Sequence, residues 1–574
     1  MMEFLKGRFK SFVSSDFFLA FLILLAYLCT NVYAYGWDDQ HLEIPLLKHL
    51  IDPSLYKGDY YVESLSKHFS SYFYPLLAKI ITVPQIPTVY FILFLLSRYF
   101  MFFWLYKLWK LISKDKLTAF CATVMFFLLG RTEEFIYRTF SHQEFAEAMM
   151  FAGIYFFYKE RYILAAMIFG FAANFHAIYN LFPMCYMVAF LILYHPQRWK
   201  KFAQVSFFFI LFCLPFLLWQ IPQSIHEKMA STPVPLSEWL PLYYRSCPQN
   251  FLFGDHSISE VFKNLTLLFN QLQPHLLLIA FYIFLLCIYP RFREDRKTNV
   301  LILTGFELVI LSCIFTYIIP SRFILDLNLI RNEQFIQLFL MGYFTFWAVK
   351  FVKEEVPWKA WVGALVFIVI GYGDIFRYSF KVKLYIVSLI FVSLVSIVLL
   401  MKRAGRWEGI LRKTLITIPI LIAFLGFCQF TYNYFQAKNN NVGYWQFFNN
   451  WIDMQTYVRG NTSKDALILV PINTDIGGFR IHSERKIVVC TRDCGIIGFD
   501  YKANKEWAQR MDDLKEYKWN PEGSISHAIM TAIMKYKVDY IVFMKYYEPQ
   551  SDNTIFKKVY QNEVFSLFKI KYPS

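Results

Sequence analysis

Two adjacent carboxylates, Asp38 and Asp39, lie where the first long apolar run of the sequence ends. The run covers residues 17–35, and the chain then continues with Gly36-Trp37-Asp38-Asp39 and a long half-polar segment. Paired acids in this place suit a general base or a metal ligand that faces a substrate in the membrane. A charge at the end of a span also avoids the large cost that it would carry at the bilayer centre. Because any helix end tolerates acids, the pair alone leaves both interpretations open.

A second acidic pair, Glu133 and Glu134, follows the third apolar run. If the apolar runs alternate in direction across a membrane, this pair opens on the same side as Asp38 and Asp39. Two acidic pairs on one face predict a site for a divalent cation, Mg²⁺ or Mn²⁺, or a division between base and metal-binding roles. A solvated turn with local Arg–Glu pairing is the alternative.

Other polar side chains gather at the same predicted membrane edge. Arg322 and Arg331 follow the ninth apolar run, where the positive-inside rule disfavours arginine. A guanidinium can bind a phosphate bidentately, and pairing with Asp326 or Glu333 is the alternative. A histidine in such an apolar region also serves as a hydrogen-bonding partner between helices. The candidate substrate-binding residues at this edge are Arg131, His142, His176, Arg322, Arg331 and Glu333.

The composition indicates that these residues are carried by membrane-spanning helices. Hydrophobic residues make up 57% of the chain and charged residues 17%, with a mean hydropathy of +0.37. Apolar runs long enough to cross the ~30 Å hydrocarbon core, which takes roughly 20 helical residues, recur throughout residues 1–434. The sequence therefore predicts a polytopic α-helical membrane protein with about 13 transmembrane helices. The spans are expected near 16–35, 86–110, 116–130, 143–158, 161–176, 178–194, 202–221, 272–290, 298–319, 334–351, 358–375, 383–401 and 413–433.

Basic residues predict the orientation of these spans. They concentrate at the head of the chain and in alternate short connections, which the positive-inside rule places in the cytoplasm. The N-terminus is then cytoplasmic, and an odd number of spans puts the C-terminus outside. This topology explains the net charge of +16. The basic loops are short and lack the patch-plus-aromatic pattern of a protein that reads bases, so we expect no nucleic-acid partner. No small-residue cleavage site follows the first run, which is expected to remain as an anchor.

Three segments outside the spans are long enough to carry function: 36–84, 222–271 and 435–574. The first contains leucines at helical spacing, which predicts a short helix lying in the membrane interface. In the third the composition becomes soluble and predicts a small α/β domain. Its strands are expected at 465–471, 486–489, 538–543 and 564–570, and its helices at 445–458 and 524–535. Cys490 and Cys494 are spaced for a short-loop disulfide, but spacing alone leaves their pairing open.

This layout resembles the GT-C superfamily of membrane glycosyltransferases. The matching residues are Gly36-Trp37-Asp38-Asp39 directly after the first span, and Glu133 and Glu134 are similar in position to a second acidic motif of some members. The resemblance covers nearly the whole chain as an architecture. Two segments of the C-terminal domain, 461–465 and 479–485, look like the tail of uncharacterised bacterial multipass proteins of this kind.

The resemblance implies a function at the outer face of the bacterial cytoplasmic membrane. Members use a polyprenyl-phosphate-linked sugar donor, and we expect inverting transfer to a glycan, lipid or protein acceptor. Asp38 or Asp39 would act as general base, with Asp39 preferred because it lies further out of the span. Arg331, or Arg322, would stabilise the leaving lipid phosphate. Two alternatives stay open: a transporter or flippase of a lipid-linked glycan, and a catalytically inactive scaffold of this fold for envelope assembly.

Overall fold

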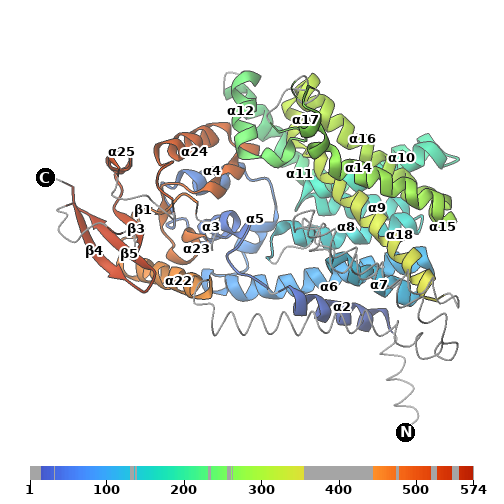
Figure 1. Cartoon of the computed structure of the whole chain (residues 1–574), viewed down its shortest axis with the longest axis horizontal. Helices are drawn as coiled ribbons and strands as arrows, with labels where there is room; N and C mark the ends of the chain where they lie inside the picture. The colour runs from blue at the N-terminus through green and yellow to red at the C-terminus, as the bar shows by residue number, and fades with distance from the viewer. Residues whose placement is uncertain are drawn as a thin grey trace, which may run out of the picture.

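The computed structural model describes residues 15–31, 33–128, 135, 139–230, 234–254, 260, 263–353, 444–473, 478–518, 526–545, 548 and 555–572. Figure 1 shows a bundle of long helices at one end and a smaller unit with a sheet, residues 444–572, at the other. Short helices from the loops of the bundle lie between the two. We call residues 444–572 the C-terminal unit and the end of the bundle that faces it the unit-side end.

The long helices coincide with the first ten predicted spans. Within the described residues, four segments are long and apolar enough to cross a membrane by length and composition: Val83–Ser113, Ala177–Tyr194, Arg198–Pro222 and Arg296–Ile318. The predicted spans between residues 358 and 433 lie outside the described residues, so the total of about 13 stays a prediction. The long helices are α2 (Asp16–Thr30), α6 (Ile86–Ser113), α7 (Lys116–Leu128), α8 (His142–Tyr158), α9 (Tyr162–Ala173), α10 (Ala177–Tyr194), α11 (Arg198–Ala230), α14 (Leu265–Ile288), α16 (Arg296–Cys313) and α18 (Glu333–Lys353).

Glycines lie at close helix crossings in the bundle. A Cβ atom on Gly153 of α8 would lie 2.3 Å from the ring of Phe169 in α9. One on Gly170 of α9 would lie 2.4 Å from the backbone carbonyl oxygen of Phe209 in α11. Small residues at such crossings are typical of membrane bundles because they let the backbones approach. These contacts place α8, α9 and α11 side by side.

The first loop forms three helices, α3 (Gln40–Ile51), α4 (Tyr60–His68) and α5 (Phe73–Ala78). The prediction of a helix here is confirmed, and its place in the membrane interface stays a prediction. Polar side chains of α3, among them Glu43 and Lys48, are buried. Lys48 Nζ donates to the carbonyl oxygen of Ile481 and to Glu484 Oε1 of the C-terminal unit, both at 2.7 Å. The helix is therefore packed between the bundle and that unit.

The C-terminal unit contains a five-stranded sheet with strand order β2-β1-β3-β5-β4. Strand β1 pairs parallel with β2 and β3, whereas β5 pairs antiparallel with β3 and β4. Four strands coincide with the predicted ones, and β4 was not predicted. The elements are α22 (Tyr444–Asn461), β1 (Leu467–Leu469), α23 (Phe479–Ser483), β2 (Lys486–Ile487), η7 (Thr491–Gly498), α24 (Tyr501–Asp513), α25 (His527–Tyr536), β3 (Tyr540–Met544), β4 (Phe556–Gln561) and β5 (Phe565–Ile570).

Candidate functional site

The turn that carries Asp38 and Asp39 is folded against the C-terminal unit. Gly36 and Asp38 both have positive φ, +82° and +48°, and the carbonyl oxygen of Gly36 accepts the N–H of Gly478 at 3.2 Å. Asp39 is exposed and stands at the N-cap position of α3. Asp38 is half-buried, and its Oδ1 lies 4.0 Å from Nη2 of Arg492 in η7. The two carboxylates therefore have different surroundings, one facing solvent and one beside a cation.

A third carboxylate, Glu43, lies one helical turn beyond Asp39 and is buried. Its Oε1 lies 2.9 Å from Nδ1 of His142, the first residue of α8. The Tyr74 hydroxyl of α5 lies 3.1 Å from the same nitrogen. Burial raises the pKa of Glu43 to about 7, although His142 opposes the shift. The first loop and the bundle thus meet at a carboxylate that can exchange a proton near neutral pH.

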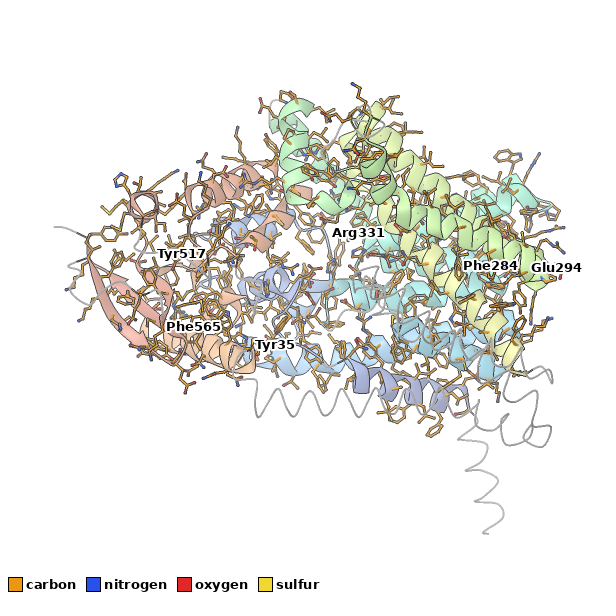
Figure 2. All side chains as sticks on the ribbon, viewed as in Figure 1. Tyr35, Phe284, Glu294, Arg331, Tyr517 and Phe565 are labelled. Carbon is orange, nitrogen blue, oxygen red and sulfur yellow. The ribbon has the colours of Figure 1, made fainter. Side chains whose placement is uncertain are left out.

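His176 and Arg331 extend this cluster on the bundle side. The rings of His142 and His176 lie 5.1 Å apart, centre to centre. Burial lowers the pKa of His176 well below its ordinary value, and the charges of His142 and Arg331 lower it further. Arg331 belongs to η5 (Leu329–Asn332) and lies between the bundle and the C-terminal unit in Figure 2. Of the predicted binding residues, the structure therefore brings together His142, His176 and Arg331.

Arg322 and Glu333 form ion pairs of their own. Arg322, in α17 (Arg322–Asp326), is 43% exposed, and its Nε lies 3.7 Å from Asp326. Glu333 lies 3.1 Å from His275 of α14. Pairing with Asp326 therefore accounts for Arg322. Arg331, in contrast, lies close enough to His176 for its charge to lower the pKa of that residue.

The predicted metal site cannot be placed. Arg131, Glu133 and Glu134 lie outside the described residues. Within the part of the chain that the structure describes, no group of three or more His, Cys, Asp or Glu could hold a metal ion. Cys490 and Cys494 are both free thiols, so the short-loop disulfide is not formed.

Charged residues also lie inside the bundle. Arg98 of α6 is buried, with Nη2 3.6 Å from Glu144 and Nη1 3.7 Å from Glu147 of α8. Glu144 also closes the start of α8, because its Oε2 accepts the backbone N–H and the hydroxyl of Ser141, both at 2.6 Å. Part of this cluster is therefore a helix cap, and the rest is an ion pair that ties α6 to α8.

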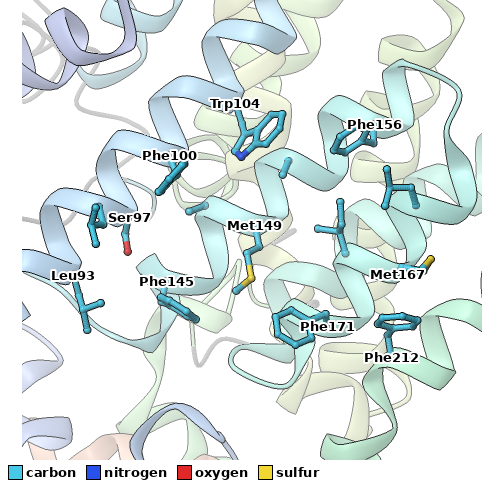
Figure 3. Close-up of a pocket in the computed structure, with 15 residues that line it drawn as sticks. Leu93, Ser97, Phe100, Trp104, Phe145, Met149, Phe156, Met167, Phe171 and Phe212 are labelled. Carbon is cyan, nitrogen blue, oxygen red and sulfur yellow. The ribbon is translucent and has the colours of Figure 1, made fainter. Parts of the chain in front are cut away.

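An apolar cavity of about 560 Å³ lies between α6, α8, α9 and α11 (Figure 3). Phe145 and Phe171 line it where α8 begins and α9 ends, at the unit-side end of the bundle. Phe145 packs edge-to-face on Phe175 with ring centres 5.1 Å apart, and Phe175 precedes His176 in the chain. One aromatic layer therefore separates the cavity from the histidine cluster.

The C-terminal unit holds the first loop through a buried arginine. Arg480 of α23 donates from Nε to Asp59 Oδ2 at 2.8 Å and from Nη1 to Asp493 Oδ1 at 2.7 Å. All three side chains are at most 2% exposed. Asp59 also caps α4 by accepting the N–H groups of Tyr61 and Val62. The position of the first loop thus depends on the C-terminal unit.

Sequence reasoning missed Glu43, Tyr74 and Arg492. Glu43 follows Asp39 by four residues, a spacing that places both on one helix face, so a signal for it was present. Tyr74 is one of many aromatics in the first loop, and nothing in the sequence singles it out. Arg492 reaches Asp38 from the C-terminal unit, and no local spacing can reveal such a contact.

Comparisons with known proteins gave two findings. Residues 449–514, which include Arg480 and Arg492, match a family described as Domain of unknown function (DUF6798). The chain is similar to the crystal structure of ArnT from Cupriavidus metallidurans bound to undecaprenyl phosphate, with a TM-score of 0.45 and 11% sequence identity over 98% of both chains. For the same protein in the apo state the TM-score is 0.44 and the identity 10%, again over 98% of both chains. No curated protein matches this chain.

Proposed function

We propose that this chain is a membrane glycosyltransferase of the GT-C type. It would move a sugar from a polyprenyl-phosphate-linked donor to a glycan, lipid or protein acceptor at the outer face of the bacterial cytoplasmic membrane. The observation that carries the proposal is the convergence of Asp39, Glu43, His142, His176 and Arg331 at one end of an apolar bundle. In this proposal the N-terminus is cytoplasmic and the C-terminal unit is outside.

The cluster contains the groups that an inverting transfer needs. A base removes the proton of an acceptor hydroxyl, whose oxygen attacks the anomeric carbon of the sugar. The bond from that carbon to the phosphate oxygen breaks, and polyprenyl phosphate leaves. Asp39, or Asp38, is the base expected from the sequence. Arg331 stabilises the charge on the leaving phosphate. Glu133 and Glu134, which lie outside the described residues, would hold a divalent cation that adds positive charge for the reaction.

The apolar cavity supports a lipid-linked donor. Its lining is almost entirely apolar, and it lies between helices of the bundle, where an isoprenoid chain can leave the lipid phase. Phe145 of the cavity lining packs on Phe175, the neighbour of His176 in the chain, so a lipid chain held in the cavity would have its phosphate close to His176 and Arg331.

Filling the cavity should therefore weaken binding of the donor. We expect Ala152→Trp, a change in the cavity lining, to raise the KM for the lipid-linked donor about tenfold, which is about 1.4 kcal/mol of binding, without changing kcat. Leu218→Trp, at an exposed position of α11, is the control and should leave both constants unchanged. Steady-state kinetics in nanodiscs measures the difference, and equal KM values in the two variants would exclude the cavity as the donor site.

The function itself is tested by donor turnover. Purified protein in nanodiscs is incubated with radiolabelled polyprenyl-phosphate-linked hexoses and pentoses and with membrane extract as the source of acceptor. We expect release of polyprenyl phosphate together with transfer of label. Asp38→Asn and Asp39→Asn should each lower kcat/KM about 10²-fold or more while the thermal unfolding midpoint stays unchanged. Full activity of both variants would remove the two aspartates from the mechanism.

The transporter is the second candidate, because Arg98, Glu144 and Glu147 place buried charges within the bundle. Charges inside membrane helices are typical of transport pathways. A transporter would move the labelled lipid between leaflets with its sugar–phosphate bond intact. Lipid scrambling without release of polyprenyl phosphate would therefore favour this candidate. If the protein neither scrambles the lipid nor releases polyprenyl phosphate, the scaffold is the remaining alternative.

A further inference from the structure

The carboxylate of Glu43 has one oxygen that no described residue satisfies. Its Oε1 lies 2.9 Å from Nδ1 of His142, whereas its Oε2 is buried and makes no hydrogen bond within the described residues. The Glu43 side chain is 4% exposed and that of His142 is 14% exposed. The imidazole is therefore the more accessible end of a buried carboxylate–imidazole pair.

Titratable and charged groups from several elements surround this pair. Asp39 lies one turn away at the N-cap position of α3, and its charge raises the pKa of Glu43. Tyr74 of α5 contacts Nδ1 of His142, and Tyr90 of α6 is close enough to Glu43 for their charges to interact. His176 packs beside the His142 ring, and the charge of Arg331 lowers the pKa of His176. Five groups therefore surround the Glu43–His142 pair: Asp39, Tyr74, Tyr90, His176 and Arg331.

The hydrogen bond to Glu43 determines which ring nitrogen of His142 can react. When Glu43 is ionised, Nδ1 of the neutral imidazole donates its hydrogen to Oε1, and the lone pair is on Nε2. The nearby Tyr74 hydroxyl also favours the ionised form of Glu43. A carboxylate in this position fixes the tautomer and stabilises the imidazolium that forms when Nε2 accepts a proton.

We infer that His142 is the proton acceptor of the transfer and that Glu43 is the residue that positions it. This inference rests on the proposed glycosyl transfer and changes only the identity of its base. The proton of the acceptor hydroxyl moves to Nε2 of His142 while the hydroxyl oxygen bonds to the anomeric carbon. The bond from that carbon to the phosphate breaks, and its electron pair leaves on polyprenyl phosphate. The Glu43 carboxylate balances the imidazolium until the proton is released to water.

The surroundings of the two aspartates favour this assignment. Asp38 lies beside Arg492, with its Oδ1 4.0 Å from Nη2, so this carboxylate already faces a cation. Asp39 is exposed, whereas the Glu43–His142 pair is largely enclosed. In this arrangement Asp39 hydrogen-bonds the acceptor, and His142 removes the proton.

The pair predicts a specific pH dependence. Burial raises the pKa of Glu43 to about 7. Below this pH the protonated carboxyl donates to Nδ1, so Nε2 carries the hydrogen and cannot accept another. Above it the carboxylate accepts from Nδ1–H, and Nε2 is free to act as base. The rate of transfer should therefore increase as the pH rises through about 7.

The test compares wild type with His142→Gln, Glu43→Gln and Asp39→Asn, with His49→Gln on the same loop as the control. Release of polyprenyl phosphate from the labelled donors is measured in nanodiscs from about pH 5.5 to about pH 8.5. We expect His142→Gln to lower kcat about 10²- to 10⁴-fold at unchanged donor KM. Glu43→Gln should abolish the rise near pH 7, whereas Asp39→Asn should raise the KM for the acceptor and retain the rise.

The outcomes separate this inference from the proposed function. No release by the wild type would overturn the proposed function. Release by the wild type with an unchanged kcat in His142→Gln, or an unchanged pH profile in Glu43→Gln, would overturn the inference alone. Infrared difference spectroscopy gives a readout besides activity. A protonated-carboxyl band that disappears near pH 7 in the wild type should be missing from Glu43→Gln, and its persistence there would also overturn the inference.

Discussion

Replacing Arg480 by methionine is expected to destabilise the protein by about 3–5 kcal/mol. The guanidinium is the cation that neutralises Asp59 of the first loop and Asp493 of the C-terminal unit, and both carboxylates are fully buried. Methionine has a similar length and keeps the apolar contacts of the stem, but it leaves two buried negative charges together. They must be hydrated or protonated, and either change opens the contact between α4 and η7.

Denaturant unfolding in detergent, followed by hydrogen exchange of α4 and η7, measures this effect. Arg245→Met is the matched control, because Arg245 pairs bidentately with Asp512 of the C-terminal unit at an exposed site, and its loss should cost at most about 1 kcal/mol. Adding Asp59→Asn and Asp493→Asn to Arg480→Met should recover part of the loss, because neutral amides tolerate burial better. Equal stability of Arg480→Met and Arg245→Met would show that the buried network contributes no more than a surface pair.

The fold could be predicted where local signals decide it. The start of α8 follows from the capping box of Ser141 and Glu144, which places His142 inside the helix. Strand β4 was missed because Lys557 and Lys558 expose their side chains at the edge of the sheet and mask the alternation of a strand. The contacts of α3 with the C-terminal unit were not predicted because the partners of Lys48 lie far along the sequence.

In the candidate site, too, local sequence signals identified some residues, whereas contacts between distant residues could not be predicted. His142, His176 and Arg331 were predicted because polar groups at the edge of an apolar run are costly without a role. Their contacts could not be predicted, because each comes from a different connection of the bundle. Glu43 is buried, yet in the sequence it resembles any polar residue on an amphipathic helix. Burial, which gives it a pKa near neutrality, is a property of the assembled structure.

Replacing Arg98 by methionine is the second change expected to have a large effect. Its guanidinium neutralises Glu144 and Glu147, which are buried at the start of α8. Nη1 of Arg98 also donates to the carbonyl oxygen of Phe135 at 2.7 Å. Removing one member of such a network costs about 3–5 kcal/mol, because the remaining charges stay in an apolar surrounding. We expect the variant to lose most of its folded, monodisperse protein, since α6 and α8 form one side of both the cavity and the histidine cluster.

Thermal unfolding monitored by size-exclusion chromatography compares Arg98→Met with Lys353→Met, which breaks the exposed pair with Asp115 and should have little effect. Neutralising Glu147 as well, in Arg98→Met with Glu147→Gln, should restore part of the folded protein and so identifies electrostatics as the cause. The rescued protein also discriminates between the two candidate functions. If it releases polyprenyl phosphate at close to the wild-type rate, the intramembrane charges serve stability alone, and the chemistry belongs to the cluster around His142. If it folds but neither releases the lipid phosphate nor moves the lipid between leaflets, the charges themselves are part of the substrate pathway, as a transporter requires.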